Sequence, residues 1–547
     1  MGLAAAGLLA LLPAGSTPAL GSDQPLPQPL THSHFSYYQG PLTDSGDGTP
    51  SEATYKNPPS PICATAATRA ANVNTDCEGT APHNETSLAV NPLNSKNIVG
   101  SANDYELNLS SGGTVLETAY SRAHVTTDSG ATWTTYPIDY SSYASTGDPA
   151  VAFDAAGNVY LSTLGFVWSQ GLGTNPDVLV AHSADGGQTW STPSRVASGS
   201  GSWASVGVFN DKEYITAWGD GNAIVTWTVF NDGQLGSYIN SPIYDVVTHD
   251  GGVTWSAPQE ISGNAPFCIG VESATACDQD QASVPTVAAD GSIHVAFENY
   301  AAASNVLTGN DQYLTVGVDP TTGARITRPY LVARLVDSIN AYPVSEDGRQ
   351  TYQDSEFRSW SAGNITADPT KAGHLAVVWS DMRNSGLPAP PNPYSAKTNS
   401  DVVASQSFDG GATWSAPVAL PVANDQFMPW GRYGSDGLLR IGYFDRSYDR
   451  ANHRYGYTLA KETTWGYLGF KTSQVTNTLS DPTQGDRWFS GRTPNAAFPH
   501  PTSFLGDYSG IAPSPAGGVV ELWTDMRNPV CFSTRCGSGE DAYFAAR

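Results

Sequence analysis

The sequence predicts an all-β protein assembled from repeated hairpins, on the basis of its composition and of one internal repeat. Among the 547 residues are 55 Gly, 38 Pro, 14 Trp and 26 Tyr, a mixture that favours strands and turns over helices. The acidic residues comprise 37 Asp and only 14 Glu. Because Asp is favoured in turns and Glu in helices, this excess also indicates turns. The repeat sets the architecture.

An octet of the form Ser/Thr-x-Asp-Gly/Ser-Gly-x-Thr-Trp occurs four times. The copies are TTDSGATW (126–133), SADGGQTW (183–190), THDGGVTW (248–255) and SFDGGATW (407–414). In such a turn the Asp side chain accepts hydrogen bonds from backbone N–H groups, and the Gly takes a positive φ. The Trp side chain folds back and packs as an apolar plug. We therefore expect a structural role for Asp128, Trp133, Asp185, Trp190, Asp250, Trp255, Asp409 and Trp414.

A longer unit recurs around these octets. It is an alternating apolar run, a turn containing Gly or Asn, and a second run that ends in aromatic or charged residues, which is the pattern of a β-hairpin. Seven copies occur, at residues 85–105, 147–166, 210–230, 281–300, 363–383, 430–446 and 506–527. The seven units repeat across roughly 460 residues, about 55–80 residues each, which is enough for one four-stranded blade apiece.

The octets are the Asp boxes of the bacterial neuraminidase repeat, and the chain resembles the sialidase-like superfamily of β-propellers. This resemblance implies a β-propeller of four-stranded antiparallel blades over residues 83–547. Seven units favour seven blades; the alternative is six, with one unit as an insertion. The last unit ends one strand short, so we expect the segment before Glu85 to supply that strand and close the ring.

The N-terminal residues predict export. Residues 3–20 form an Ala- and Leu-rich run that ends in small residues, which is typical of a secretory signal, here assigned to residues 1–21. Residues 22–82 are interpreted as a Pro-rich leader or a strap across the surface. No later run is long enough to span a membrane. We expect a secreted, extracellular monomer.

The six cysteines are near neighbours in sequence: Cys63 with Cys77, Cys268 with Cys277, and Cys531 with Cys536. In an exported chain this spacing favours three local disulfides over a metal site. Six cysteines allow about 15 pairings, so the connectivity itself stays open.

The charge is large and uneven. The formal net charge is −25, and residues 1–321 hold 30 acids against 6 bases while residues 322–547 hold 21 against 20. Such a chain has no basic surface for nucleic acid.

Blade topology sorts the charged residues by face. The start of each innermost strand and the end of the second strand lie on one face, which we take as the functional face, and the octets lie on the other. Acids precede the first strand in five units: Glu85, Asp148, Asp211, Asp280 and Asp507. Such a ring could hold an axial Ca²⁺ as a structural ion, or its members could cap loop amides. No cofactor is required otherwise.

Arginines follow the second strand in three consecutive units, at Arg383, Arg446 and Arg527, and Arg432 lies nearby. Converging guanidinium groups bind a carboxylate bidentately. The alternative is that each Arg pairs with the Asp of its own D-x-R or D-R sequence.

The resemblance to sialidases also implies catalytic roles, because that family uses an Arg triad, a Tyr nucleophile assisted by a Glu, and an Asp acid/base. Tyr508 in GDYSG matches the nucleophile, Glu298 the assisting Glu, and Asp148 or Asp104 the acid. The Arg-Ile-Pro motif that carries the family's first Arg is absent. The sequence thus favours a glycoside hydrolase of the exo-α-sialidase type acting on glycans, with a non-catalytic propeller that binds glycan or protein as the alternative.

Overall fold

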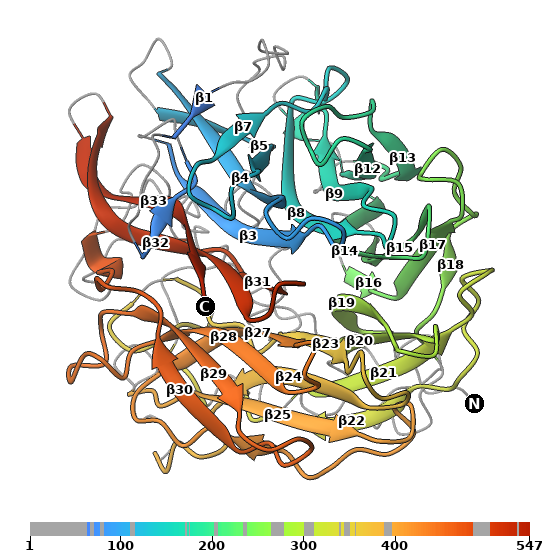
Figure 1. The fold of residues 1–547 in the computed structure, drawn as a ribbon. Coiled ribbons are helices and arrows are strands. Elements are labelled where there is room, and N and C mark those ends of the chain that lie inside the picture. The colour runs from blue at the N-terminus through green and yellow to red at the C-terminus, as the bar shows by residue number, and fades with distance from the viewer. Residues whose placement is uncertain are drawn as a thin grey trace, which may run out of the picture.

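Seven antiparallel sheets follow one another around a central axis in the computed structural model (Figure 1). The structure describes residues 63–65, 71–76, 81–109, 115–169, 172–173, 175–201, 206–233, 238–263, 278–299, 311–337, 341–343, 350–355, 357–387, 397–484, 504–532 and 535–547. The seven sheets confirm the all-β propeller and the prediction of seven blades over six.

Blades 1 to 4 each run from an innermost strand beside the axis to an outermost strand at the rim. The innermost strands of neighbouring blades pack against one another. In chain order the strands are β3 (His83–Val90), β4 (Ile98–Leu109), β6 (Ala123–Thr126) and β7 (Thr134–Tyr136); β8 (Ser145–Phe153), β9 (Val159–Phe166), β12 (Asp177–Ser183) and β13 (Ser194–Ala197); β14 (Gly207–Trp218), β15 (Asn222–Asp232), β17 (Ile243–Thr248) and β18 (Gln259–Glu260); and β19 (Asp280–Val287), β20 (Ile293–Asn299), β21 (Gln312–Val318) and β22 (Tyr330–Arg334).

Blades 5 to 7 complete the ring, and the last blade takes its outermost strand from the N-terminal side of the chain. Their strands are β23 (Asn364–Ala367), β24 (Leu375–Asp381), β25 (Asp401–Ser407) and β26 (Val418–Ala419); β27 (Gln426–Tyr433), β28 (Leu439–Asp445), β29 (Gly456–Glu462) and β30 (Phe470–Gln474); and β31 (Gly510–Pro513), β32 (Val519–Phe532), β33 (Arg535–Ala546) and β2 (Val73–Asn74). Val73 pairs with Phe544 and Asn74 with Tyr543, so the predicted closure is confirmed.

Short additional strands extend some blades. They are β1 (Cys63–Ala64), β5 (Val115–Ser121) and β16 (Tyr238–Asn240). Two more short strands, β10 (Trp168–Ser169) and β11 (Leu172–Gly173), pair with each other in a separate two-stranded sheet. The segment interpreted as a leader or strap therefore contributes β1 to blade 1 and β2 to blade 7. Among the described residues the helical structure is the 3₁₀ turn η4 (Pro482–Gln484), and no helix there is long and apolar enough to cross a membrane.

The four octets form the same turn. In the first, Asp128 accepts the Thr132 backbone N–H at 2.9 Å and the Thr132 hydroxyl at 2.7 Å, and the Thr126 hydroxyl accepts the Gly130 N–H at 2.9 Å. Trp133 is fully buried and packs edge-on against Phe544 of blade 7, with 5.0 Å between ring centroids. These contacts are the turn and plug that the octet predicts.

Bulges interrupt the innermost strands of five blades at one common place. Each bulge opens with a non-glycine residue at positive φ: Glu85 (53°), Asp148 (59°), Lys212 (51°), Ala282 (59°) and Met428 (47°). Two residues on the inner strand then oppose one on the second strand, and the backbone turns the bulge side chains away from the regular alternation.

Two groups of predictions lie outside what the structure describes. The signal segment 1–21 and most of the Pro-rich segment fall outside the described residues, as do Cys77, Cys268 and Cys277. Cys531 and Cys536 face each other in the register of the β32–β33 hairpin, but the cysteine side chains are not among the described parts. The disulfides stay a prediction.

Candidate functional site

An ion cluster fills the axis of the propeller where the inner-strand bulges meet. The ammonium nitrogen of Lys212, from blade 3, lies 3.1 Å from Glu85 Oε1, 2.7 Å from Asp148 Oδ2 and 2.6 Å from Asp507 Oδ2. These carboxylates come from blades 1, 2 and 7, and all four side chains are at most 5% exposed. A single lysine thus joins four blades at the centre of the ring.

The carboxylates of this cluster respond differently to burial. Burial and the neighbouring Asp148 raise the pKa of Glu85 well above its ordinary value. Burial acts on Asp507 in the same direction, but Arg358 and Lys212 outweigh it and lower its pKa. Burial alone would lower the pKa of Lys212, whereas Asp148, Asp507 and Glu85 raise it well above normal. Lys212 is therefore charged, and Asp507 is more firmly ionised than Glu85.

Three of the five acids predicted to form an axial ring meet at Lys212, and two do not. Asp211 accepts the backbone N–H of Lys212 at 3.0 Å, and burial raises its pKa to about 7. Asp280 accepts the Asn299 side-chain amide at 2.6 Å, away from the ion pairs of Lys212. The ammonium of Lys212 supplies the cation at the place where the sequence suggested Ca²⁺.

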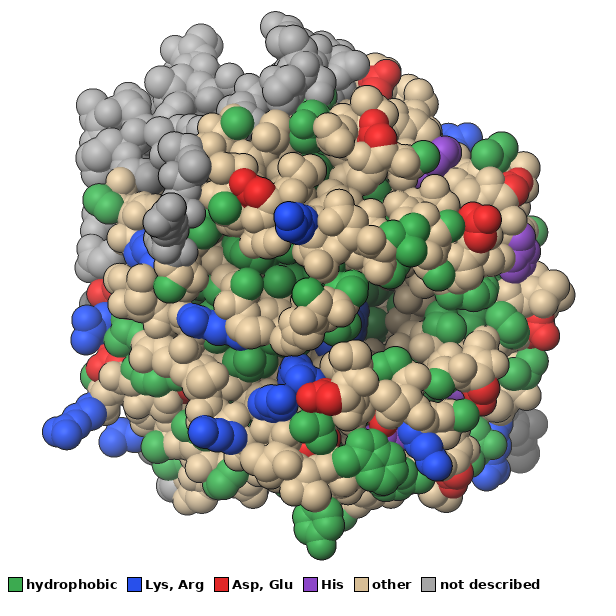
Figure 2. Space-filling model, in the orientation of Figure 1, with side chains coloured by type: hydrophobic (Ala, Val, Ile, Leu, Met, Phe, Trp, Pro, Cys, Tyr) green, Lys and Arg blue, Asp and Glu red, His purple; other side chains and the backbone are tan. Residues whose placement is uncertain are grey.

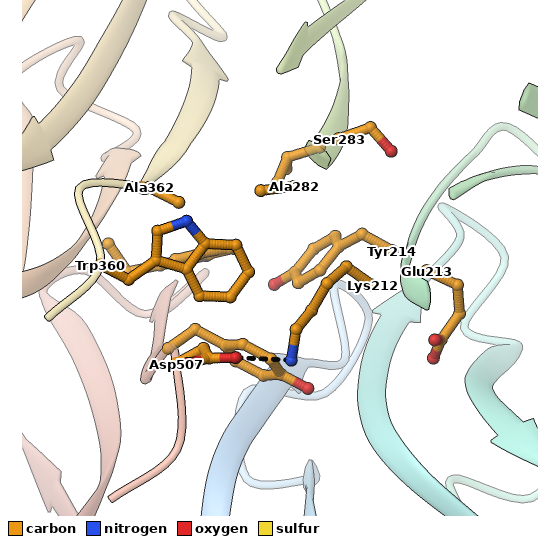
Figure 3. Close-up of a pocket in the computed structure, with 12 residues that line it drawn as sticks. Lys212, Glu213, Tyr214, Ala282, Ser283, Trp360, Ala362 and Asp507 are labelled. Carbon is orange, nitrogen blue, oxygen red and sulfur yellow. Dashed lines mark ion pairs between the residues drawn. The ribbon is translucent and has the colours of Figure 1, made fainter. Parts of the chain in front are cut away.

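A pocket opens beside this cluster, on the side of blades 3 to 7. Its walls include the aromatic side chains of Tyr214, Trp360, Trp430 and Tyr508, and the Lys212–Asp507 ion pair forms part of its lining (Figure 3). The cavity volume is about 30 Å³, room for about two water molecules. Figure 2 shows the surface hollowed near the middle of the ring. The innermost part therefore admits one small substituent of a ligand.

Tyr508, the predicted nucleophile, lines this pocket. Its hydroxyl donates to the Pro149 carbonyl oxygen at 3.1 Å, and its ring packs against Trp430 and Tyr214 with centroids 5.9 and 6.4 Å away. Burial, followed by the charges of Glu85 and Asp148, raises the pKa of Tyr508 well above its ordinary value. The phenol is therefore neutral. The predicted acid, Asp148, lies close to the pocket because it pairs with Lys212, which lines it.

Glu298, the predicted partner of Tyr508, lies behind the pocket wall. Its Oε2 accepts the indole N–H of Trp360 at 3.0 Å, and its side chain is fully buried. Glu298 thus acts on the site through Trp360, whose ring also lies 5.3 Å from the Lys212 ammonium nitrogen. The other candidate acid, Asp104, is in blade 1 beside two histidines.

The predicted arginine triad does not converge. Arg383 binds Asp381, two residues away, with 2.6 Å between Nη2 and Oδ2, and Arg527 binds Asp525 in the same way at 2.6 Å. Arg446 is fully buried and binds Asp425, the residue just before β27, at 3.2 Å. Arg383 and Arg527 thus follow the alternative given above, pairing within one blade.

Arg432 donates to the Gly431 carbonyl oxygen at 3.1 Å. Neither it nor any member of the predicted triad is among the residues that line the axial pocket.

The structure supplies the site with residues that the sequence did not single out. Arg358 binds Asp507 through two nitrogens, with Nε to Oδ1 at 2.6 Å. Glu213 lines the pocket and its pKa is raised well above normal, first by burial and then by Asp148. The signal for Lys212 and Glu213 is the sequence Asp-Lys-Glu at the bulge. Trp360 and Arg358 precede blade 5 in a stretch without the repeat, so no pattern marks them.

The fold and this site define a seven-bladed β-propeller with an aromatic-walled axial pocket above a buried ion cluster. No protein-family model matches the chain, and a search of curated proteins finds no significant match.

Solved structures do resemble the chain. A protein of unknown function from Dyadobacter fermentans is 11% identical, covers 88% of this chain and 99% of its own, and gives a TM-score of 0.42. The Hadza microbial sialidase Hz136 is 12% identical over 79% of this chain and 75% of its own, with a TM-score of 0.41. The NanB sialidase of Streptococcus pneumoniae is 9% identical over 89% and 99%, also with a TM-score of 0.41. At these identities the likeness concerns the fold and carries no activity to this chain.

Proposed function

We propose that the protein is a secreted glycoside hydrolase that binds a glycan at the mouth of the axial pocket, with one substituent of a sugar residue in its innermost part. The observation that carries this proposal is that an aromatic-walled pocket is lined by two carboxyl groups whose pKa values are shifted in opposite directions. Burial raises the pKa of Glu213, whereas Arg358 and Lys212 lower the pKa of Asp507 against the effect of burial. Glycoside hydrolysis uses such a pair, one group protonated and the other ionised.

The roles of the two groups follow from their charge. Asp507 is the anion that would stabilise positive charge on the sugar ring or attack it, and Glu213 holds the proton that the leaving oxygen needs. In Figure 3 the Glu213 carboxyl points away from Trp360, so delivery of that proton requires its side chain to rotate. Tyr508, as a neutral phenol, would position the sugar through its hydroxyl.

The charge of the site favours a neutral sugar over a sialic acid. Three carboxylates surround Lys212, and Arg358 forms an ion pair with Asp507. The predicted arginines bind Asp residues elsewhere. A sugar carboxylate would therefore meet no unpaired cation of the predicted set, and burying it beside Asp507 would cost free energy. The exo-α-sialidase activity that the sequence predicts is therefore tested as an alternative, with an α-sialoside beside the neutral glycosides.

The experiment is a panel of fluorogenic glycosides, neutral sugars and an α-sialoside, assayed with the parent protein and three variants. We expect a neutral glycoside to be cleaved, and Glu213→Gln and Asp507→Asn to lower kcat about 100-fold or more. Arg383→Ala, a buried-pair variant outside the pocket, should keep activity within about two-fold of the parent. Circular dichroism confirms that each variant is folded.

The outcomes separate three possibilities. Cleavage of the sialoside alone would overturn the neutral-sugar assignment and leave a hydrolase. If the protein cleaves none of the glycosides, the proposal that it is a glycoside hydrolase is wrong. A binding module is the second candidate, because every charged group drawn into the Lys212 cluster is already paired. Glycan binding that Trp360→Ala abolishes, without turnover, would then identify the propeller as such a module.

A further inference from the structure

A second cluster of ligand-forming side chains lies within blade 1, apart from the axial pocket. It consists of His83 in β3, Asp104 in β4 and His124 in β6, three neighbouring strands, and His83 pairs with Asp104 in the strand register. Each side chain is about 1% exposed. One ligand atom from each residue lies within 4.8 Å of the other two.

Both imidazoles turn Nε2 toward the same carboxylate. His124 Nε2 lies 2.9 Å from Asp104 Oδ2, and His83 Nε2 lies 3.5 Å from Asp104 Oδ1. The rings meet edge-on, with 5.9 Å between centroids. Asp104 Oδ1 is buried and accepts no hydrogen bond from the described residues.

The group on the far side of each ring can accept a hydrogen from its Nδ1. The Thr75 hydroxyl can donate its single hydrogen to the Ala542 carbonyl oxygen at 3.0 Å, which leaves it an acceptor for His124 Nδ1, also at 3.0 Å. His83 Nδ1 lies 3.0 Å from the Ala81 carbonyl oxygen, which can only accept. With Nδ1 as the donor in both rings, each Nε2 is available to coordinate a metal ion beside Asp104.

Two imidazole nitrogens and a buried carboxylate oxygen that lie within 4.8 Å of one another form a donor set suited to a divalent transition-metal ion. We propose that His83, His124 and Asp104 bind a divalent transition-metal ion of the Zn²⁺ type. With two Nε2 atoms and one carboxylate oxygen the site offers three protein donors and leaves a fourth position for water, and tetrahedral Zn²⁺ with bonds of about 2.0–2.1 Å separates its donors by about 3.3 Å. The two nitrogen–oxygen distances lie on either side of that value.

The surroundings have the form that metal-bound histidines usually show. In such sites the second ring nitrogen donates to a carbonyl, a carboxylate or a hydroxyl, which fixes the ring. Here Ala81 and Thr75 take this role, and Asp76 Oδ2 lies 3.4 Å from His83 Nδ1. Thr75 directly follows the closing strand β2, and Ala542 belongs to β33 of blade 7. The ion would therefore stabilise the junction at which the ring closes.

Blade 5 provides a matched comparison. His374 Nδ1 lies 2.8 Å from Asp368 Oδ2 and both side chains are buried, as in blade 1. Only one histidine is present there, and Asp368 also accepts hydrogen bonds from Thr370 and Trp465. This His–Asp pair is complete without a metal ion.

The test uses the full chain without a histidine tag. The protein is stripped with a chelator, dialysed, titrated with Zn²⁺ and separately with Co²⁺, and its metal content is measured by mass spectrometry. We expect one ion per chain, visible absorption typical of tetrahedral Co²⁺, and a Tm increase of about 3 °C with Zn²⁺ at about 100 times its Kd. His124→Gln and Asp104→Asn should lose the ion, and His374→Gln should retain it.

Absence of bound metal in the stripped and reloaded parent protein would overturn the proposal and leave the cluster as a buried His–Asp–His hydrogen-bond network. Equal metal content in the parent, His124→Gln and Asp104→Asn proteins would overturn it as well. If the variants fail to fold, the Co²⁺ spectrum of the parent decides, because an octahedral spectrum or none contradicts this donor set. None of these measurements depends on glycosidase activity.

Discussion

Replacing Lys212 by Met tests whether the axial ion cluster holds the propeller together. Met fills much of the same space and leaves Glu85, Asp148 and Asp507 without their shared cation, which lies 2.6–3.1 Å from each. Removing one partner of a buried ion pair costs about 3–5 kcal/mol. A propeller of roughly 460 residues unfolds with an entropy of about 1 kcal/mol per kelvin, so this cost lowers Tm by about 3–5 °C.

The assay is thermal unfolding followed by circular dichroism at near-neutral pH, with Lys461→Met as the control. Lys461 forms an exposed pair with Asp436, at 47% and 42% exposure, and its loss should change the free energy of unfolding by less than about 0.5 kcal/mol. A Lys212→Met protein within about 1 kcal/mol of the parent would refute the reasoning. Such a result would mean that the three carboxylates are neutral or reach water in the folded protein.

Three further predictions concern pH, the repeated turn and the cluster itself. Burial raises the pKa of Asp245 to about 8, so the folded state holds this proton, and the parent loses stability as pH rises from the ordinary Asp value through about 8. Asp245→Asn should therefore gain about 1–3 kcal/mol over the parent near pH 8.5 and little near pH 4; equal differences at both would contradict it. Trp133→Ala should cost about 3–5 kcal/mol because Trp133 is fully buried, and the partly buried Trp255 should cost clearly less; urea unfolding of both variants measures this. The double variant Lys212→Met/Asp148→Asn should have a higher Tm than Lys212→Met alone, because the second substitution removes one unpaired carboxylate. An unchanged Tm would argue against coupling between Lys212 and Asp148.

The fold could be predicted because it depends on local patterns. The octets place Asp, Gly and Trp at fixed spacing, and the hairpin units count the blades directly. The closure by β2 follows from a unit that is one strand short, since an open edge strand is unfavourable. These features need no knowledge of which distant residues meet.

The site could be predicted only in part, because it depends on the inner-strand bulges. Alternation with period two aligns Asp211 with Glu85 and Asp148, whereas the bulge puts Lys212 in the equivalent position. One residue of shift replaces an expected acid by a base, and with it the expected Ca²⁺ by an ammonium group. Arg446 illustrates the same limit, because it binds Asp425, just before the neighbouring strand β27, although Asp445 adjoins it in sequence.

The response to salt distinguishes the buried cluster from the surface charge. The chain has a net charge of −25, so added salt should screen repulsion among surface acids and raise the Tm of the parent. Lys212 is 5% exposed and its three partners at most 2%, so mobile ions do not reach between them. The Tm difference between the parent and Lys212→Met should therefore stay the same between about 0.05 and about 1 M NaCl, while both values rise. A difference that shrinks with salt would show that solvent ions enter the axis, and the cluster would then have the small energy of a surface pair.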